Sequence, residues 1–278
     1  MNKKKIEKEY YKKLKLIIDF NKNYYDLSKP LVSDKEYDDL KKSILILESK
    51  YSFLNSEKSP SKVVGFTPSK NFQKISHRVP MLSLANAFGK EDLINFEKKI
   101  LNFLSKDKYF KLSYSVEPKI DGISASLIYK NGVFRIGLSR GDGKEGEDIT
   151  ANLATIKDIP KKIQSKDFPK LIDIRGEVYI QNSDFEHLKE KFANPRNAAS
   201  GSLRQKNPEE TKKIPLKFIA YTFGYEKGLK AKNQTEFLKN LDDWGFKTNP
   251  LNKLVRSVDN LLINYSKIEK SRTKIDFD

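Results

Sequence analysis

Apolar residues recur at steps of three and four along the first fifty positions, and this pattern predicts two amphipathic helices. The first helix is expected over residues 1 to about 22. The second is expected to begin after Ser33, because Ser33 and Glu36 have the spacing of a capping box, in which each side chain accepts a hydrogen bond from the backbone N–H of the other residue. Residues 55–71 are rich in Ser, Pro and Lys, which is typical of a linker. We therefore expect a helical subdomain over residues 1–70.

Beyond this linker, helical stripes are interspersed with runs in which every second residue is apolar. One such run contains Tyr114 and Val116, and a second over residues 123–129 turns at Asn131-Gly132 and returns, which is typical of a tight β-hairpin. The same two patterns predict further strands over residues 171–180 and 215–225, and helices over residues 93–104, 235–244 and 258–270. This mixture predicts an α+β domain over residues 71–278.

Composition limits the classes of protein and of site. The 278 residues contain no apolar run of about 18 residues, and no apolar segment follows the charged N-terminus. We therefore expect no membrane span and no signal peptide, and a cytoplasmic location. The chain has no Cys and only two histidines, His77 and His187, which excludes a disulfide and a thiolate zinc site and argues against a histidine metal cluster. Any metal should be a hard cation bound by oxygen, such as Mg²⁺.

A net charge of +17 suggests a nucleic-acid partner, but lysine, isoleucine and asparagine are all abundant, and an AT-rich genome produces the same bias. Arginine is more informative, because only eight of the 54 basic residues are arginine. Four of these lie inside short polar motifs, where a planar guanidinium suits bidentate phosphate contacts. They are Arg140, Arg175, Arg196 and Arg204.

Lys119 is the candidate nucleophile. It follows a predicted strand, stands between the carboxylates of Glu117 and Asp121, and precedes Gly122, whose missing side chain allows close approach of a ligand. A lysine amine must lose its proton before it attacks, and its reference pKa is near 10.4, so a positive neighbour or desolvation would favour the reactive form. The pattern Lys-x-Asp-Gly is short, and its weight comes from the motifs that follow it.

Three motifs follow Lys119 in a fixed order: Ser139–Gly143, Arg175–Val178 and Phe192–Gln205. Together with Glu117–Gly122 they closely resemble the bacterial NAD-dependent DNA ligase family in its adenylation region, from about Tyr24 to the C-terminus. The resemblance implies an antiparallel-sheet nucleotidyltransferase domain, of the ATP-grasp-like ligase adenylation type. It also implies that the N-terminal helical subdomain recognises NAD.

The resemblance further implies a role for each candidate residue. Lys119 would attack the α-phosphate of NAD, forming lysyl-AMP and releasing nicotinamide mononucleotide (NMN), while Asp121 orients the lysine or the ribose. With Mg²⁺ as cofactor, the AMP would then pass to the 5′-phosphate of a nick in double-stranded DNA, by a monomeric enzyme of DNA replication and repair. The implied contacts are Tyr24, Asp34, Tyr37 and Asp38 with NMN, Ser83, Leu84, Glu117, Arg140, Glu177 and Tyr221 with the adenine nucleotide, and Arg196 and Arg204 with DNA.

The residues themselves leave alternatives for several of these sites. Asp34, Tyr37 and Asp38 share one helix face, where the aromatic ring suits either the helical core or the cationic nicotinamide ring, and the carboxylates suit either the helix dipole or ribose hydroxyls. Other candidates also have ordinary explanations: a core strand or loop over residues 79–88, a surface turn over residues 140–146, and core packing for Tyr221.

Two other functions remain open. An ATP-using ligase or capping-type nucleotidyltransferase shares Lys-x-Asp-Gly, although the acidic and aromatic helix argues against it. Relatives continue after Asp278 into a strand with an Asp-Gly…Lys pattern, so the chain is expected to be truncated and incomplete as a ligase; a non-catalytic nucleotide- or DNA-binding remnant is therefore the second alternative. Ile275 and Phe277 predict the start of a strand that ends before it can pair, and the connection between Glu177 and Phe192 is expected to be shorter than in relatives.

Overall fold

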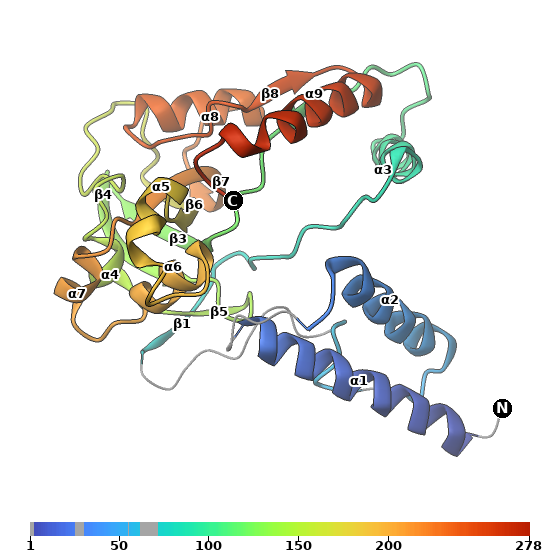
Figure 1. Cartoon of the computed structure of the whole chain (residues 1–278). Coiled ribbons are helices and arrows are strands. Elements are labelled where there is room, and N and C mark those ends of the chain that lie inside the picture. The colour runs from blue at the N-terminus through green and yellow to red at the C-terminus, as the bar shows by residue number, and fades with distance from the viewer. Residues whose placement is uncertain (1–2, 26–30, 55, 62–71) are drawn as a thin grey trace. The chain divides into compact units, whose positions relative to one another are not determined.

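The computed structural model describes residues 3–25, 31–54, 56–61 and 72–278, and Figure 1 labels its helices and strands. The chain separates into two compact units. One comprises Met1–Ser83 with Arg140–Asp148, and the other comprises Leu84–Ser139 with Ile149–Asp278. The predicted division between residues 70 and 71 lies at the edge of a segment outside the described residues, and it stays a prediction.

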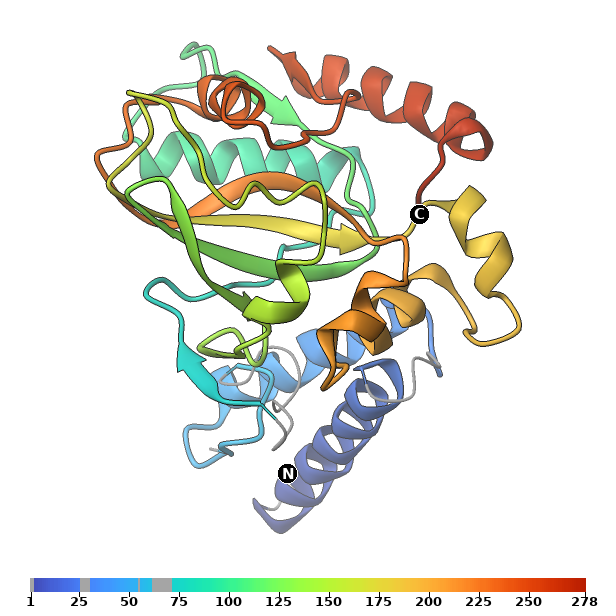
Figure 2. The ribbon, with the colours of Figure 1, turned by 90° about the vertical axis from the view of Figure 1, so that its left-hand side faces the viewer.

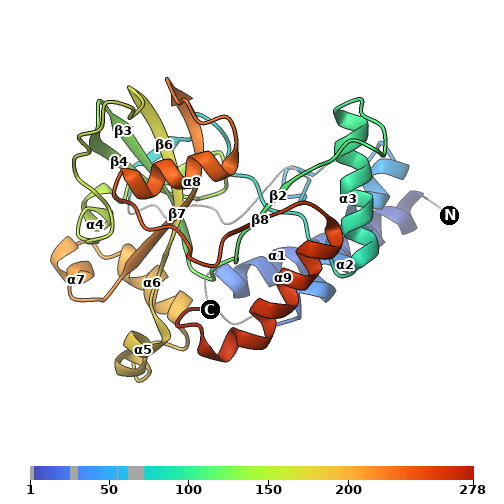
Figure 3. The same ribbon diagram turned by 90° about the horizontal axis from the view of Figure 1, so that it is seen from above.

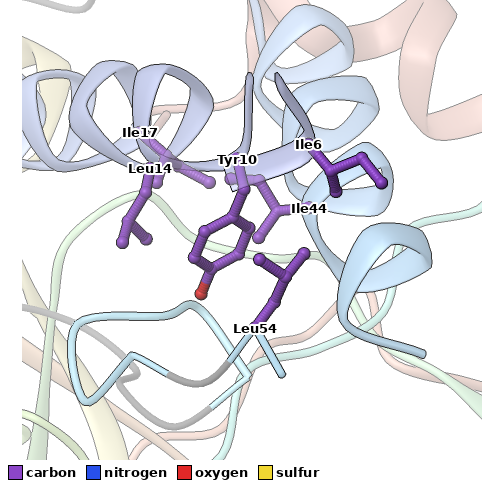
Figure 4. Packing of buried hydrophobic residues seen from close by; sticks show 6 residues of the cluster. All are labelled: Ile6, Tyr10, Leu14, Ile17, Ile44 and Leu54. Atoms are coloured by element: carbon purple, nitrogen blue, oxygen red, sulfur yellow. The ribbon is translucent and has the colours of Figure 1, made fainter. Parts of the chain in front are cut away.

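The first unit contains the two predicted helices, α1 (Lys3–Tyr25) and α2 (Asp34–Lys50). The capping box at the start of α2 is confirmed, since the Ser33 N–H donates to Glu36 Oε2 at 2.9 Å and the Glu36 N–H donates to Ser33 Oγ at 3.3 Å. The apolar stripes of both helices meet around the fully buried Tyr10 ring, whose hydroxyl donates to Glu48 at 2.7 Å. Figure 4 shows this cluster, which consists of Ile6, Tyr10, Leu14, Ile17, Ile44 and Leu54.

A small antiparallel sheet joins two distant segments of the first unit. Strand β1 (Lys74–Ser76) pairs with β5 (Glu145–Glu147), with Ile75 opposite Gly146. The pairing continues beyond the strands, because the Met81 N–H donates to the Gly143 carbonyl at 2.8 Å. The segment before Ser83 is therefore tied to the glycine-rich loop that begins at Arg140.

The second unit is built on a four-stranded antiparallel sheet in the order β4-β3-β6-β7. The predicted hairpin is confirmed: Asn131 and Gly132 both have positive φ, 51° and 73°, as a type I′ turn requires. The predicted strands over residues 171–180 and 215–225 are confirmed as the two other members of the sheet. The four strands are β3 (Ile123–Lys130), β4 (Val133–Ser139), β6 (Leu171–Tyr179) and β7 (Lys217–Lys227).

The two faces of this sheet differ in polarity. Successive side chains of a strand point to opposite faces, so Leu127 and Ile174, which pair in register, share an apolar face with Phe223. This face packs against α8 (Gln234–Asp243), where the rings of Phe223 and Phe237 lie 4.8 Å apart. In Figures 1 and 2, α8 lies above the sheet as drawn and three short helices lie below it. These helices are α4 (Thr150–Leu153), α6 (Pro195–Leu203) and α7 (Pro208–Lys212).

A second group of elements lies around a two-stranded sheet. The predicted strand at Tyr114 and Val116 is confirmed as β2 (Tyr114–Val116), and its partner is β8 (Lys253–Val255) rather than the hairpin that follows it. Figure 3 shows this sheet beside two long helices, α3 (Lys90–Phe103) and α9 (Val258–Ser271). The remaining short elements are α5 (Asn182–Phe185) and single turns of 3₁₀-helix at Glu186–Leu188 and Arg272–Lys274.

The prediction that Ile275 and Phe277 begin an unpaired strand is wrong. Residues 275–278 form no strand, and their backbone is bonded: the carbonyls of Asp276 and Asp278 accept from the N–H groups of Asn182 at 3.2 Å and Asp121 at 2.7 Å. The reason is the Asp276 carboxylate, which accepts from the Ser183 N–H at 2.8 Å and hydroxyl at 2.6 Å. These bonds hold the tail against the residues that follow β6.

Within the part of the chain that the structure describes, no helix has the length and apolar character needed to cross a membrane.

Gly176, in the middle of β6, provides a test of the sheet. A Cβ atom at this position would lie 2.3 Å from the Ile219 carbonyl oxygen and 2.3 Å from the Phe218 ring. Because the carbonyl belongs to a neighbouring strand and cannot turn away, we expect Gly176→Ala to lower the free energy of unfolding by at least about 2 kcal/mol. Urea denaturation of the purified chain measures this change.

The matched control is Gly89→Ala, because a Cβ at Gly89 meets no atom within 4 Å. Gly89 is the N-cap of α3, so its replacement should cost less than about 1 kcal/mol. Equal losses in the two variants would contradict the close packing of β6 against β7.

Candidate active site

The loop that carries Lys119 packs closely against strand β6. Lys119 itself is exposed, whereas its neighbour Ile120 is buried. A Cβ on Gly122 would lie 2.2 Å from the Val178 carbonyl oxygen and 2.9 Å from Glu177 Cγ. The glycine of Lys-x-Asp-Gly is therefore needed for close packing of the loop on β6, and this packing brings Lys119 to the same end of the sheet as Glu177.

Asp121 is held by two distant parts of the chain. Its carboxylate accepts a hydrogen bond from Arg196 Nη1 at 2.6 Å, and its N–H donates to the Asp278 carbonyl at 2.7 Å. Arg196 lies in the first turn of α6, which Asn194 caps by accepting from the Asn197 N–H at 2.8 Å. The sequence pattern did not predict α6, because the buried face of this helix consists mostly of small residues: Pro195, Ala198, Ala199, Ser202 and Leu203.

Glu177 is the buried carboxylate of this site, with 9% of its surface exposed. It lies opposite Ser124 in the register of β3 and β6, and the Ser124 hydroxyl donates to Glu177 Oε2 at 2.8 Å. Burial raises the pKa of Glu177 to about 7, although the Ser124 hydrogen bond and the charges of Arg196 and Lys119 act in the opposite direction. We refer to Lys119, Asp121, Ser124, Glu177 and Arg196 as the Lys119 cluster.

Glu117 and Tyr221 are joined by a residue that the sequence did not single out. Gln234 Nε2 donates to Glu117 Oε1 at 2.9 Å and to the Tyr221 carbonyl at 2.7 Å. The Ser115 hydroxyl donates to the same Glu117 oxygen at 2.8 Å. Gln234 directly precedes the predicted helix over residues 235–244 and lies 117 positions after Glu117, and no local pattern indicates a contact over that distance.

Arg175 has a structural position. It is buried on β6, and its guanidinium occupies the space over Gly224, where a Cβ would lie 2.6 Å from Nη2. Burial lowers the pKa of Arg175, and the charges of Asp173 and Tyr221 act in the opposite direction. The arginine of the Arg-Gly-Glu motif is thus part of the polar face of the sheet.

In the first unit, the structure brings together Ser83 and Arg140. Arg140 Nη2 donates to Ser83 Oγ at 2.9 Å, and the Arg140 carbonyl lies 3.1 Å from the ring nitrogen Nε2 of His77. The following Gly141 has a φ of +57°, and a Cβ there would lie 1.8 Å from the Glu145 carbonyl oxygen. Leu84 is 78% exposed, so residues 79–88 do not form a core strand but an irregular segment.

The candidate NMN residues lie on the two N-terminal helices. Tyr37 packs against the helical core cluster, and its hydroxyl donates to Asn21 at 2.9 Å. Of the two interpretations of this ring, the structure therefore agrees with packing in the helical core. Asp38 is half-buried on the same helix. The side chains of Tyr24 and Asp34 lie outside the described residues.

Arg204, the second candidate DNA contact, is the C-cap residue of α6 and is exposed. It lies eight positions after Arg196, which corresponds to about 12 Å along a helix axis. The two arginines therefore mark the two ends of α6, one beside the Lys119 cluster and one at the surface.

Comparison with known proteins identifies the family. The model of the NAD-dependent DNA ligase adenylation domain matches residues 69–278, and that of the DNA ligase-like, N-terminal NAD+-binding domain matches residues 3–65. The chain belongs to the NAD-dependent DNA ligase adenylation domain family. This confirms the predicted fold class, with N-terminal helices followed by an antiparallel-sheet adenylation domain.

Relatives named DNA ligase are longer than this chain. The DNA ligase of Pelagibacter ubique is 64% identical over all 278 residues, which are 41% of its own length. That of Mesorhizobium japonicum is 44% identical over 266 residues, 93% of this chain and 36% of its own. That of Rickettsia bellii is 43% identical, with 100% of this chain and 42% of its own covered. The chain spans about two-fifths of the length of these ligases.

The electrostatics of this adenylation domain can be tested through Glu177. Its folded-state pKa, about 7, lies above its ordinary value of 4.5, so the folded chain binds this proton more strongly between those pH values. The free energy of unfolding should therefore fall as pH rises from 4.5 to 7, and Glu177→Gln should remove that fall. The change amounts to up to about 3 kcal/mol.

Chemical denaturation of the parent chain and of Glu177→Gln at several pH values measures this difference. Glu190→Gln is the matched control, because it makes the same substitution at an exposed position outside the Lys119 cluster. A difference between Glu177→Gln and the parent that stays constant from pH 4.5 to 7 would show that Glu177 is ionised normally.

Proposed function

We propose that this chain is the adenylating part of an NAD-dependent DNA ligase and that Lys119 is its nucleophile. The observation that supports this most strongly is the Lys119 cluster, in which an exposed lysine lies on a tightly packed loop among two carboxylates and a guanidinium. Fixed charges around a reactive amine suit phosphoryl and nucleotidyl transfer, which depends on positioning and charge stabilisation.

In the proposed reaction, Lys119 Nζ attacks the α-phosphorus of NAD. A phosphorus–nitrogen bond forms, the bond from that phosphorus to the bridging oxygen breaks, and NMN leaves with the electron pair. Lys119 must also lose a proton. Glu177 is suited to hold it, because its pKa of about 7 allows both proton uptake and release at neutral pH. Arg196, fixed by Asp121, would stabilise negative charge on the α-phosphate.

We assign contacts with the adenine nucleotide to six residues that the sequence analysis singled out. They are Glu117, Glu177, Tyr221, Leu84 and the hydrogen-bonded pair Ser83 and Arg140. The match of residues 3–65 to an NAD+-binding domain supports recognition of the NMN half of NAD by the helices, and argues against the ATP-using alternative. The residues that we assign to NMN are Tyr24, Asp34, Tyr37 and Asp38.

Magnesium fits this chain as an ion held mainly by phosphate oxygens. Among the described residues, no group of three or more His, Cys, Asp or Glu side chains could form a metal site. Mg²⁺ is commonly bound through one or two carboxylates and substrate phosphates. When bound, it would supply further charge stabilisation at the α-phosphate.

The second half of the proposed function is transfer of AMP to the 5′-phosphate of a DNA nick. Arg196 lies at the Lys119 cluster, where that phosphate has to arrive, and Arg204 presents a guanidinium at the other end of α6. We propose that both contact the DNA backbone, in a monomeric cytoplasmic enzyme of replication and repair. Backbone contacts of this kind position a duplex without reading its sequence.

Incubation with NAD and Mg²⁺ should add one adenylyl group to the chain, as measured by intact-mass spectrometry. Lys119→Ala should reduce this addition below detection, because it removes the attacking nitrogen. Lys111→Ala removes an exposed lysine just before β2 and should adenylate like the parent. Adenylation of Lys119→Ala, or equal adenylation of the parent by ATP, would contradict the proposed reaction.

Binding to nicked duplex DNA should weaken with salt, and Arg204→Ala and Arg196→Ala should each lower the slope of log K against log salt concentration by about one. Arg135→Ala is the control, since Arg135 is an exposed arginine on β4 whose removal changes the net charge equally. Fluorescence anisotropy over a salt series measures the slopes. If Arg204→Ala and Arg135→Ala give the same slope, binding depends on overall charge and not on α6.

A further inference from the structure

We propose that Gln234 is a positioning residue that fixes the Glu117 carboxylate and the Tyr221 main chain to each other, and so determines how the adenine nucleotide is held. The inference rests on the proposed function, because that function gives Glu117 and Tyr221 their roles at the nucleotide. No motif of the sequence points to Gln234, whereas its hydrogen bonds in the fold do.

The backbone of Gln234 is held in place by helix α8. It is the first residue of α8, directly after the N-cap Asn233, whose side chain accepts from the Glu236 N–H at 2.9 Å. The apolar side of α8 is buried through Phe237, Leu238 and Leu241. Because the cap fixes the helix end and the core fixes the helix, the Gln234 backbone is held in place relative to the sheet.

The side-chain amide of Gln234 uses both of its N–H groups. One points to Glu117 Oε1 at 2.9 Å and the other to the Tyr221 carbonyl at 2.7 Å. Ser115 donates to the same Glu117 oxygen at 2.8 Å. Two donors thus hold Oε1, while Oε2 accepts no hydrogen bond from any residue that the structure describes. The carboxylate is fixed through one oxygen and offers the other to a ligand.

Tyr221 lies at an irregularity of the sheet. The register between β6 and β7 passes from Gly176 opposite Ala220 to Arg175 opposite Thr222, so Tyr221 is the additional residue of a β-bulge. A bulge redirects a side chain, and bulges are frequent beside active sites. The bond from Gln234 to the Tyr221 carbonyl fixes the orientation of this bulge, and with it the direction of the aromatic ring.

This arrangement indicates the chemistry of the ligand. A free carboxylate oxygen accepts an N–H or O–H, and a bulge-directed tyrosine offers an aromatic face. An adenosine moiety has both features, in its exocyclic amine, its ribose hydroxyls and its flat base. Glutamine suits the bridging position because it donates two hydrogen bonds without a charge. A lysine there would neutralise Glu117, and a glutamate would repel it.

Gln234→Glu tests the proposal, because it keeps the size of the side chain and replaces the donors by a second carboxylate. In a Lys119→Ala background, where no covalent step consumes NAD, we expect calorimetry at pH 7.5 to show at least tenfold weaker NAD binding. At pH 5.5 the affinity should approach that of the background chain, because two facing carboxylates share a proton once the pH is low enough. Glu177 titrates in the same range in every variant, so each is compared with the background chain at equal pH.

Asn240→Asp, on the same helix, adds the same charge and should change NAD affinity less than twofold at either pH. Gln234→Met removes both donors without adding charge; it should weaken binding at both pH values, and it decides the matter if Gln234→Glu does not fold. Unchanged affinity of Gln234→Met or of Gln234→Glu at pH 7.5 would overturn the role of Gln234, as would weak binding of Gln234→Glu that persists at pH 5.5. Absence of NAD binding by the background chain would instead overturn the proposed function, and with it this inference.

Discussion

The close approach of the Lys119 loop to strand β6 is the constraint on which the rest of the site depends. Gly122 leaves no room for a side chain between itself and the Val178 carbonyl, so the loop lies directly on the strand that carries Glu177. Once the loop is in this position, Asp121 reaches Arg196 on α6, and Ser124 reaches Glu177. Gly122 therefore organises the charges around Lys119 through its close packing on β6.

That constraint also explains why the site combines exposure with burial. Lys119 is exposed, while Glu177 is buried and has a pKa near 7 because burial outweighs its positive neighbours. A fully exposed carboxylate at this place would be ionised at neutral pH, and a carboxylate buried without a positive neighbour would hold its proton more firmly. The position of β6 beneath the loop therefore determines how far burial raises the pKa of Glu177 against the effect of its positive neighbours.

Contacts between residues close in the sequence could be predicted, and contacts between distant residues could not. The capping box of Ser33 and Glu36 and the turn at Asn131-Gly132 depend on neighbouring residues, and both were predicted correctly. The buried face of α6 consists mostly of small residues, so hydrophobic periodicity did not reveal this helix. The end of the chain was predicted to begin a strand, although Asp276 binds it to Ser183. Gln234 was missed because its partners come from two other parts of the chain. Motif resemblance pointed to four of the five residues of the Lys119 cluster, Ser124 being the exception, but not to the bonds between them.

The bond between the Asp121 N–H and the Asp278 carbonyl joins positions 157 residues apart (278 − 121) and closes most of the second unit into a loop. Contacts of such large sequence separation form late in folding, because the chain between them must lose its freedom first. A ribosome delivers residues in order, so the hydrogen bonding of the loop that carries Lys119 is completed only after position 278 has emerged. Lys119 is therefore synthesised well before its loop takes its final position.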